Sequence, residues 1–366
     1  MLIQVIGTNS WNKGAELMLY AIAAQRQSTL QNHSLAVQYG RTSPETVARL
    51  GLTQLPSGIR SVVARASRLG RGFVSESRVE AVLDASGFAY SDQWGARPSM
   101  SSAALLQKRR RNGCKIVLMP QAFGPFEDST VRNAFASVAA TADLIYARDR
   151  RSHQHLIHAG CEPSTIRMAP DFTLALDAGT NSDSLETTGR VLIVPNVRML
   201  DKTTSASAYV EFLARVTEHL HARGAEPLFV LHTAAEDRVV VTRVQENLLR
   251  SVTTIVEPDV LRLKRLLGAA RLVLSSRYHA IIGSLSAGVP CIATGWSHKY
   301  DELYADYHAP DLLMHDLSDF NTGRALIDLL LDDPLPLRNA LLQRTAEMRL
   351  QVSAMWSEIG ELLGRS

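Results

Sequence analysis

Short apolar segments alternate with amphipathic segments along most of this chain, and this alternation limits its fold more than any other feature. In the first half, the predicted strands are Leu2–Ile6, Ser34–Gln38, Glu80–Asp84, Lys115–Met119 and Asp143–Tyr146. The helices predicted between them are Lys13–Gln27, Met100–Arg111, Ser129–Ala140 and Asp149–Ala159. Strands that alternate with helices predict a parallel sheet with helices on both faces, the α/β class.

A polar stretch, Asp177–Gly189, interrupts this pattern and has the composition of a linker. After it, strands are predicted at Arg190–Val194, Pro227–Leu231, Thr253–Val256, Arg271–Leu274 and Pro290–Thr294. The helices predicted there are Ala206–Arg223, Asp237–Arg250, Val260–Ala270 and Tyr278–Ala287. A helical tail should follow from Asp319 to Leu363, with a break at Asp332–Pro334.

The chain has 366 residues, a length that favours two domains. Together with the repeated pattern, this predicts two Rossmann-like domains that face one another across a cleft. We place the N-terminal domain at residues 1–180 and the C-terminal domain at 181–345, with a terminal helix at 346–366.

Composition and missing motifs exclude several classes of function. The chain carries 39 Lys and Arg against 36 Asp and Glu, and a net charge of +3 does not indicate nucleic-acid binding. Cys114, Cys161 and Cys291 are too few and too widely spaced for a disulfide framework or a CxxC zinc site. The P-loop, GxGxxG, HExxH and GxSxG motifs are absent from the sequence. We therefore expect no metal, no cofactor and no nucleic-acid partner.

The sequence favours a cytoplasmic location. The opening MLIQVIG is apolar for one strand only, whereas a signal peptide needs a basic start and a longer apolar region. No run approaches the ~18 apolar residues that span a bilayer. Five arginines between Arg60 and Arg78 indicate a solvated amphipathic helix or, alternatively, a basic surface at the inner face of a membrane.

The stretch Leu272–Pro290 reads as strand, turn, helix and helix stop. Ser275 or Ser276 can cap the helix, which places Arg277 and His279 in its first turn. Ligands of open α/β sheets bind at such strand ends, and a helix N-terminus favours an anion. A structurally paired arginine and a satisfied histidine are the alternative.

Other loops predicted at strand ends offer polar side chains. Lys299 lies in the loop Gly295–Glu302, after a strand. The loop Gly7–Glu16 follows the first strand and contributes Asn9, Asn12, Gly14 and Glu16. Each also has a structural interpretation, as a surface lysine or a helix-capping turn.

Two further loops of the first half follow strands in the same way. Pro120–Pro125 supplies Gln121 and Gly124, and Arg148 stands at the end of the next strand beside Asp149. A rigid turn and an Arg–Asp structural pair are the alternatives to a binding role.

Six short motifs in this order resemble the polysaccharide pyruvyltransferase family over about residues 1–305. They are Asn12–Met18, Pro120–Pro125, Tyr146–Asp149, Pro170–Asp171, Ser276–Ala280 and Lys299. The resemblance implies a GT-B-like fold with an N-terminal acceptor side, a C-terminal donor side and a last helix that returns toward the N-terminal domain. It also implies transfer of pyruvate from phosphoenolpyruvate onto a sugar of a cell-envelope polysaccharide or glycan precursor, as a cyclic ketal.

The resemblance departs from the family pattern at two places. Many members have Gly-Asp where this chain has Gly14-Ala-Glu16, and a glycine-rich turn where it has Asp84–Asp92. Both departures lie on the acceptor side, so the acceptor sugar, its bridged hydroxyls and any lipid linkage stay open.

The resemblance also implies roles for individual residues. Arg277, His279 and Lys299 would hold the donor, with Arg148 approaching from the other domain. We assign the proton transfer to His279, because imidazole titrates near neutrality. Arg277 and Lys299 would stabilise the departing phosphate, and Glu16 or Asp171 would activate an acceptor hydroxyl. The remaining predicted substrate-binding residues are Asn9, Asn12, Gly14, Gln121, Gly124 and Ser276.

Two other functions fit the same architecture. A GT-B glycosyltransferase would use a nucleotide-sugar, with Glu257–Asp259 as a ribose-binding segment. A non-catalytic module would bind a carbohydrate or an anion within a polysaccharide assembly.

Overall fold

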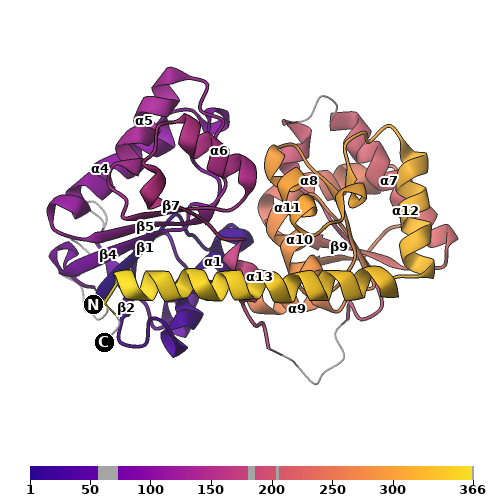
Figure 1. Ribbon diagram of the computed structural model, residues 1–366. Helices are drawn as coiled ribbons and strands as arrows, with labels where there is room; N and C mark the ends of the chain where they lie inside the picture. The colour runs from indigo at the N-terminus through magenta and orange to yellow at the C-terminus, as the bar shows by residue number, and fades with distance from the viewer. Residues whose placement is uncertain (57–72, 180–185, 203–205, 365–366) are drawn as a thin grey trace. The chain divides into compact units, whose positions relative to one another are not determined.

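The computed structural model describes residues 1–56, 73–179, 186–202 and 206–364 (Figure 1). The chain divides into two units. The first unit comprises Met1–Trp11, Ala15–Phe172 and Arg349–Ser366, and the second comprises Asn12–Gly14 and Thr173–Met348. The predicted boundaries at residues 180 and 345, and the assignment of an acceptor and a donor side, stay predictions.

The first unit is built on a parallel sheet with the strand order β3-β2-β1-β4-β5-β6-β7. Its strands are β1 (Leu2–Ile6), β2 (Ser34–Gln38), β3 (Thr53–Leu55), β4 (Val79–Asp84), β5 (Lys115–Gln121), β6 (Leu144–Ala147) and β7 (Ile166–Met168). Its helices are α1 (Lys13–Ala24), α2 (Pro44–Arg49), α4 (Arg97–Arg111), α5 (Ser129–Ala139) and α6 (Arg150–His158). Short 3-10 helices lie at Gln25–Gln27, Glu76–Arg78, Asp92–Trp94, Pro163–Thr165 and Phe172–Ala175.

The central strands of this sheet are buried along nearly their whole length, as expected where helices cover both faces. Helices α4, α5 and α6 gather on one of these faces (Figure 1). Asp128 and Asp149 cap α5 and α6 through side-chain hydrogen bonds to backbone N–H groups. The side chains that end the strands are thereby held by rigid elements.

The second unit repeats this plan with the order β10-β9-β8-β11-β12-β13. Its strands are β8 (Val191–Val194), β9 (Pro227–Leu231), β10 (Thr254–Val256), β11 (Leu272–Ser275), β12 (Cys291–Thr294) and β13 (Leu313–Met314). Its helices are α7 (Ala206–Ala222), α8 (Ala234–Gln245), α9 (Val260–Gly268), α10 (Tyr278–Leu285), α11 (His298–Asp306) and α12 (Phe320–Asp332), and α13 (Leu335–Leu362) begins there. Short 3-10 helices lie at Val197–Leu200 and Pro310–Leu312.

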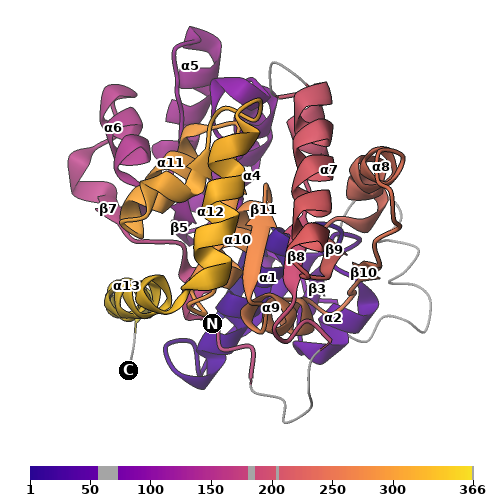
Figure 2. The ribbon, with the colours of Figure 1, turned by 90° about the vertical axis from the view of Figure 1, so that its right-hand side faces the viewer.

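Helix α7 packs against α8 and α12, and α9 packs against α10. These helices can be followed in Figure 2. Helix α13 supplies residues to both units, because the division falls at Arg349 within it.

Both sheets have a topological switch point, where the chain leaves the first strand in opposite directions. It lies between β1 and β4 in the first unit and between β8 and β11 in the second. Ligands of doubly wound sheets bind outside the carboxyl ends of the strands at such a point. The predicted α/β fold with two Rossmann-like halves is confirmed, and it directs attention to these two places.

Two local predictions are wrong. Lys299 does not lie in a loop, because α11 begins at His298. Neither Ser275 nor Ser276 occupies the cap of α10, because Arg277 is itself the N-cap residue. Most of the arginine-rich segment after Arg60, with the membrane surface predicted from it, lies outside the described residues, as does part of the predicted linker. Within the described ranges, no helix is long and apolar enough to cross a membrane.

Candidate functional site

Arg277 is held at the switch point of the second unit by a buried carboxylate. Its Nε lies 3.0 Å from Oδ2 of Asp237, and its Nη2 contacts Oδ1 of the same residue. Asp237 is completely buried and also accepts hydrogen bonds from the backbone N–H groups of Val197 and Thr233, at 3.0 and 2.9 Å. The ion pair fixes the plane of the guanidinium. The structural pairing weighed for Arg277 is therefore present, and its contact with a donor stays a prediction.

His279 follows in the first turn of α10 and lies against Gly14, the second residue of helix α1. A Cβ on Gly14 would lie 2.2 Å from Nδ1 of His279, far inside van der Waals contact. Gly14 thus leaves the space that the imidazole fills. Asn12 supports this turn, because its Oδ1 accepts a hydrogen bond from Gly14 N at 3.0 Å. Three predicted site residues of the second unit thus meet in one place.

His232, which sequence reasoning missed, belongs to the same group. It follows β9, is 6% exposed, and its Nδ1 is buried without a hydrogen-bond partner within the described ranges. Burial, and then the charges of Arg277, His279 and Lys13, hold the pKa of His232 well below its usual range. His232 thus lies near the basic side chains of Arg277 and Lys13, the first of which is paired with Asp237. The signal available in the sequence was its position directly after a buried strand.

Lys299 projects over aromatic rings in the first turn of α11. Its Nζ lies 4.6 Å from the ring centroid of Trp296, 5.2 Å from Tyr300 and 5.5 Å from Tyr278. Such rings attract a cation and hold it in position. The lysine is half-buried, so it differs from the ordinary surface lysine weighed as the alternative.

Ser276 is buried and hydrogen-bonds to residues of several neighbouring elements. Its Oγ lies 2.8 Å from Tyr209 Oη and 2.5 Å from Thr294 Oγ1, and its carbonyl accepts hydrogen bonds from Tyr300 and Asn196. These bonds fix the backbone that leads into Arg277. The predicted contact of Ser276 with substrate stays a prediction.

In the first unit, Arg148 and Asp171 form a buried ion pair at the carboxyl ends of β6 and β7. Arg148 Nη1 lies 2.9 Å from Asp171 Oδ2, and both side chains are at most 3% exposed. The arginine is paired, as in the structural alternative, but with Asp171 rather than with its neighbour Asp149. Asp149 instead caps α6.

The end of β5 and the loop that follows it place Gln121 and Gly124 at the same sheet edge. Gln121 is fully buried and donates a hydrogen bond of 3.4 Å to the carbonyl of Asp84. Gly124 has a φ of +74°, and a Cβ there would lie 2.6 Å from Cγ of His155. This position accordingly needs glycine for two reasons, the backbone conformation and the close imidazole.

The other predicted residues of the first unit lie near β1. Glu16 is buried in α1 and accepts a 2.6 Å hydrogen bond from Thr46 Oγ1. Asn9 lines a cavity of about 350 Å³ at the ends of β1 and β2. The structure thus places Asn9 and Glu16 in the first unit, and their contact with an acceptor stays a prediction.

The model of one protein family, described as polysaccharide pyruvyl transferase, matches residues 72–298. The chain belongs to the polysaccharide pyruvyl transferase family. The match spans more than half of the chain and includes Arg277 and His279, so the resemblance recognised in the short motifs is confirmed. No curated protein matches the chain significantly.

Solved structures similar to this family member show its fold. Anabaena HepE in complex with UDP-glucose has a TM-score of 0.62 at 12% identity, covering 99% of this chain and 98% of that one. UDP-GlcNAc 2-epimerase from Neisseria meningitidis has a TM-score of 0.62 at 10% identity, covering 99% of both chains. MnaA from S. aureus, bound to UDP, has a TM-score of 0.59 at 11% identity, with 94% and 90% covered. The pyruvyl transferase fold of this chain is therefore GT-B-like.

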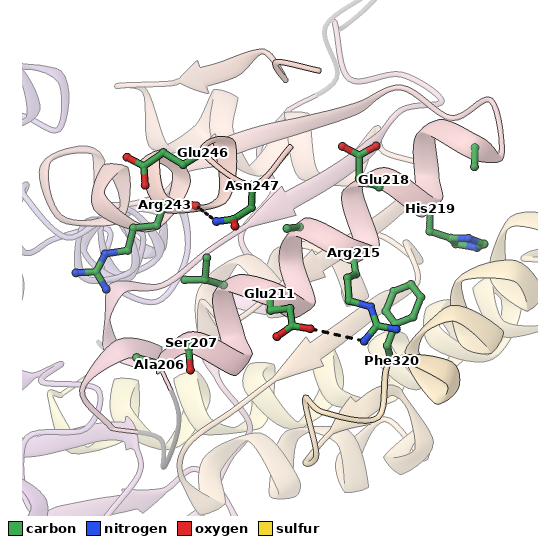
Figure 3. A pocket seen from close by; sticks show the side chains of 13 residues that line it. Ala206, Ser207, Glu211, Arg215, Glu218, His219, Arg243, Glu246, Asn247 and Phe320 are labelled. Carbon is green, nitrogen blue, oxygen red and sulfur yellow. Dashed lines mark hydrogen bonds and ion pairs between the residues drawn. The ribbon is translucent and has the colours of Figure 1, made fainter. Parts of the chain in front are cut away.

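A wide groove of about 1370 Å³ lies elsewhere on the second unit of this pyruvyl transferase (Figure 3). It runs along α7, where Arg215 lies 3.9 Å from Glu211 and 4.2 Å from the ring centroid of Phe320. Its lining mixes acidic and basic side chains, which suits neither a phosphate nor a carboxylate. We place the candidate site at the switch points instead. Among the residues the structure describes, no three His, Cys, Asp or Glu side chains are arranged to hold a metal.

Proposed function

We propose that this protein transfers the pyruvate group of phosphoenolpyruvate onto two hydroxyls of a sugar, forming a ketal and releasing phosphate. The proposal is supported by basic side chains at the switch point of the second unit: Arg277, oriented by Asp237, His279, packed against Gly14, and Lys13. Phosphoenolpyruvate bears a carboxylate and a phosphate on a small frame. Binding it requires cations from separate elements, and these come from α10 and the start of α1.

In the proposed reaction, the donor methylene first gains a proton from His279. The adjacent carbon becomes electrophilic and bonds to the first acceptor hydroxyl oxygen. The second hydroxyl oxygen then bonds to the same carbon, and the bond between this carbon and the phosphate oxygen breaks. Of the two hydroxyl protons, one restores His279 and the other leaves with the phosphate, so atoms and charges balance.

Arg277 and Lys299 would stabilise the charge on the departing phosphate. The Asp237 pair presents the Arg277 guanidinium in one orientation, and the aromatic rings restrict Lys299. Such fixed positions reduce the reorganisation needed when charge develops. Arg148 as a donor contact, and Glu16 or Asp171 as the acceptor-activating base, stay predictions.

Two of the similar solved structures hold UDP or UDP-glucose, but at 11% and 12% identity they show the fold alone and do not decide for the nucleotide-sugar alternative. The segment predicted to bind ribose is occupied by local interactions. Glu257 accepts a hydrogen bond from Asp259 N and pairs with Arg262 at 2.9 Å, and Asp259 caps α9. These contacts already engage both carboxylates, which weakens the case for a nucleotide-sugar. A non-catalytic binding module would turn over neither phosphoenolpyruvate nor a nucleotide-sugar.

The deciding experiment incubates the full chain with phosphoenolpyruvate and a panel of glycans. Release of phosphate together with new ketal methyl signals in the NMR spectrum is the expected result, with turnover that persists when a metal chelator is added. Phosphoenolpyruvate should also raise the melting temperature by mass action. A thermal shift with a nucleoside diphosphate, and none with phosphoenolpyruvate, would establish the glycosyltransferase alternative instead.

A further inference from the structure

The turn between strand β9 and helix α8 consists of His232 and Thr233. Strand β9 is separated from β11 by β8 alone, and the three strands are parallel. The turn therefore lies at the same edge of the second sheet as Arg277, which follows β11. Ligands of such sheets bind at this edge, yet the proposed function gives neither His232 nor Thr233 a role.

Thr233 occupies a position where its hydroxyl would ordinarily be bonded. It is the N-cap residue of α8, and an N-cap threonine usually accepts a hydrogen bond from an N–H of the first turn. Its side chain makes no such bond, and its Oγ1 is buried without a hydrogen-bond partner among the residues that the structure describes. An unpaired buried polar group costs about 1–3 kcal/mol. A ligand that bonds to this hydroxyl would remove the cost.

His232 is in the same condition directly beside it. The residue is 6% exposed, and its Nδ1 lacks a hydrogen-bond partner in the described part of the chain. Burial is the main reason why the pKa of His232 lies well below its usual range, so the ring is neutral. A neutral imidazole has one N–H donor and one acceptor nitrogen. His232 therefore offers a ligand a hydrogen bond rather than a charge.

A single buried carboxylate holds this turn in a fixed position relative to Arg277. Asp237, in the first turn of α8, accepts a 2.9 Å hydrogen bond from Thr233 N. The other bond of the same oxygen, Oδ2, is to Nε of Arg277 at 3.0 Å. Thr233 and Arg277 are thus linked through one side chain, and a ligand that contacts both residues needs no rearrangement of the backbone.

The charges at the start of α8 limit the kind of ligand that suits it. A helix N-terminus favours an anion through its free N–H groups and its dipole. Two carboxylates in the first turn oppose this preference. The charge of Asp237 is compensated by Arg277, and the side chain of Glu236 is 52% exposed, so that water weakens its field. The preference for an anion therefore remains.

Phosphate is the anion that these groups fit best. Its three terminal oxygens accept hydrogen bonds from separate directions, whereas the two oxygens of a carboxylate lie in one plane and match a guanidinium fork. A hydroxyl, an imidazole N–H and the N–H groups of a helix start supply hydrogen bonds from separate directions. Helix N-termini commonly bind phosphate groups in this way.

We propose that the start of helix α8 binds the phosphate group of the donor, with the hydroxyl of Thr233 and the ring N–H of His232 as hydrogen-bond donors. The inference rests on the proposed function, because that function supplies phosphoenolpyruvate as the donor. It adds a second helix start to the one at α10, with two residues that lie outside the six short motifs. When the phosphate leaves, these groups stabilise the charge that develops on its oxygens.

The first test measures the affinity of the full chain for inorganic phosphate, phosphoenolpyruvate and pyruvate by calorimetry. Thr233→Val removes the hydroxyl and keeps the branched shape, and Thr242→Val makes the same change at an exposed position of α8, as the matched control. We expect Thr233→Val to lower the affinity for phosphate and phosphoenolpyruvate about tenfold, the equivalent of ~1.4 kcal/mol. The affinity for pyruvate, which has no phosphate, should stay the same, and Thr242→Val should change none of the three.

The melting temperature without ligand is a second readout. Because the hydroxyl of Thr233 has no partner in the described part of the ligand-free chain, Thr233→Val should leave the melting temperature unchanged or raise it. A merely structural role of Thr233 would lower the melting temperature and leave the affinity for phosphate unchanged.

The imidazole is tested by a pair of variants at one position. His232→Phe keeps an aromatic ring but removes both nitrogens, and it should also lower the affinity for phosphate about tenfold. His232→Gln supplies an amide N–H and should restore part of that affinity. Equal affinities of His232→Phe and the unaltered chain would remove His232 from the proposed subsite.

The outcomes separate this inference from the proposed function. Equal affinities of the Thr233→Val and Thr242→Val variants for phosphate would overturn the phosphate subsite even if phosphoenolpyruvate is turned over. An equal loss of affinity for pyruvate would mean that the carboxylate is the group recognised, contrary to the inference. Conversely, UDP that binds the unaltered chain and binds Thr233→Val more weakly, without turnover of phosphoenolpyruvate, would uphold the subsite and overturn the proposed function.

Discussion

Strands β4 and β11 hold equivalent places, because each pairs with the strand that comes first along the chain in its unit, β1 or β8. Strand β4 leads into Ser86, whereas β11 leads into Arg277. Arg277 is paired with the buried Asp237 beside imidazole groups, whereas Ser86 is bonded to the buried Asp84 beside hydroxyls, amides and Arg41. One strand order therefore carries two different sets of side chains at its switch points. The topology fixes the place, and the first residues beyond the strands fix the chemical groups found there.

Loss of the proposed proton donor at the second switch point should have the largest effect on turnover. His279→Ala should lower turnover at saturating phosphoenolpyruvate by ~10²–10⁴-fold, the range for a lost general acid. The affinity for the donor should change less. The control is His315→Ala, whose side chain is 71% exposed. Near-normal turnover with only the donor affinity reduced would make His279 a binding residue, and the second switch point would then bind without supplying the proton.

Removal of the Asp237 carboxylate tests whether the position of Arg277 depends on this buried ion pair. Asp237→Ala leaves the guanidinium without its partner, and the loss of one member of a buried pair costs about 3–5 kcal/mol of unfolding free energy. Denaturant titration measures this change. Glu236→Ala alters the neighbouring carboxylate, which is 52% exposed and 4.0 Å from Arg277, and should change stability by less than about 0.5 kcal/mol. Equal effects of the two variants would show that the pair does not anchor the site.

A smaller effect is expected when the space for the imidazole is filled. Gly14→Ala places a Cβ against Nδ1 of His279 and should displace the ring. A misplacement of about 1 Å can lower turnover by about 10²-fold. Gly283→Ala is the matched control, because Gly283 lies on α10 like His279 and its Cβ would meet Leu267 of α9 at an ordinary 3.4 Å. Steady-state kinetics of both variants measure this effect. Equal turnover of Gly14→Ala and Gly283→Ala would contradict the prediction.

The smallest effect should come from the cation held over aromatic rings. Lys299→Met keeps a long side chain but removes the charge, and we expect a loss of about 0.5–1 kcal/mol in unfolding free energy. Donor affinity should fall as well. Lys299→Arg should retain most of the stability and of the donor affinity. Unchanged donor affinity in Lys299→Met would show that Lys299 does not hold the donor.

Much of the fold could be predicted from local patterns. Strands β1, β2 and β9 begin and end where their apolar runs do, and the break around Pro334 separates α12 from α13. The unpredicted strands β3, β7 and β13 have three residues or fewer and lie toward or at the edges of their sheets. Such segments carry too few residues for a period to show, and pairing with a neighbouring strand defines them.

The site was predictable only in part, for a similar reason. Arg277 and His279 stand out as cations at a strand end, a signal that is local in the sequence. The partner of Arg277 is 40 positions away, and Asp237 looks like any acidic residue near a helix start. The placement of Lys299 was missed because Gly295–Glu302 has no apolar periodicity, although α11 starts within it. Pairings between distant segments depend on the folded sheet, which no local pattern encodes.

Helix α13 has a consequence for the order in which the chain can fold. The first unit includes residues from Arg349 onward, where Trp356 is buried and Glu358 bonds to Tyr146 and Arg167 at 2.7 Å. These residues follow the whole second unit in the sequence, so a ribosome makes them last. During synthesis, the N-terminal sheet is complete long before the segment that covers it exists. The first unit therefore emerges first but is completed last. Until the second unit and α13 have been translated, the apolar surface that Trp356 covers is exposed to chaperones or to aggregation.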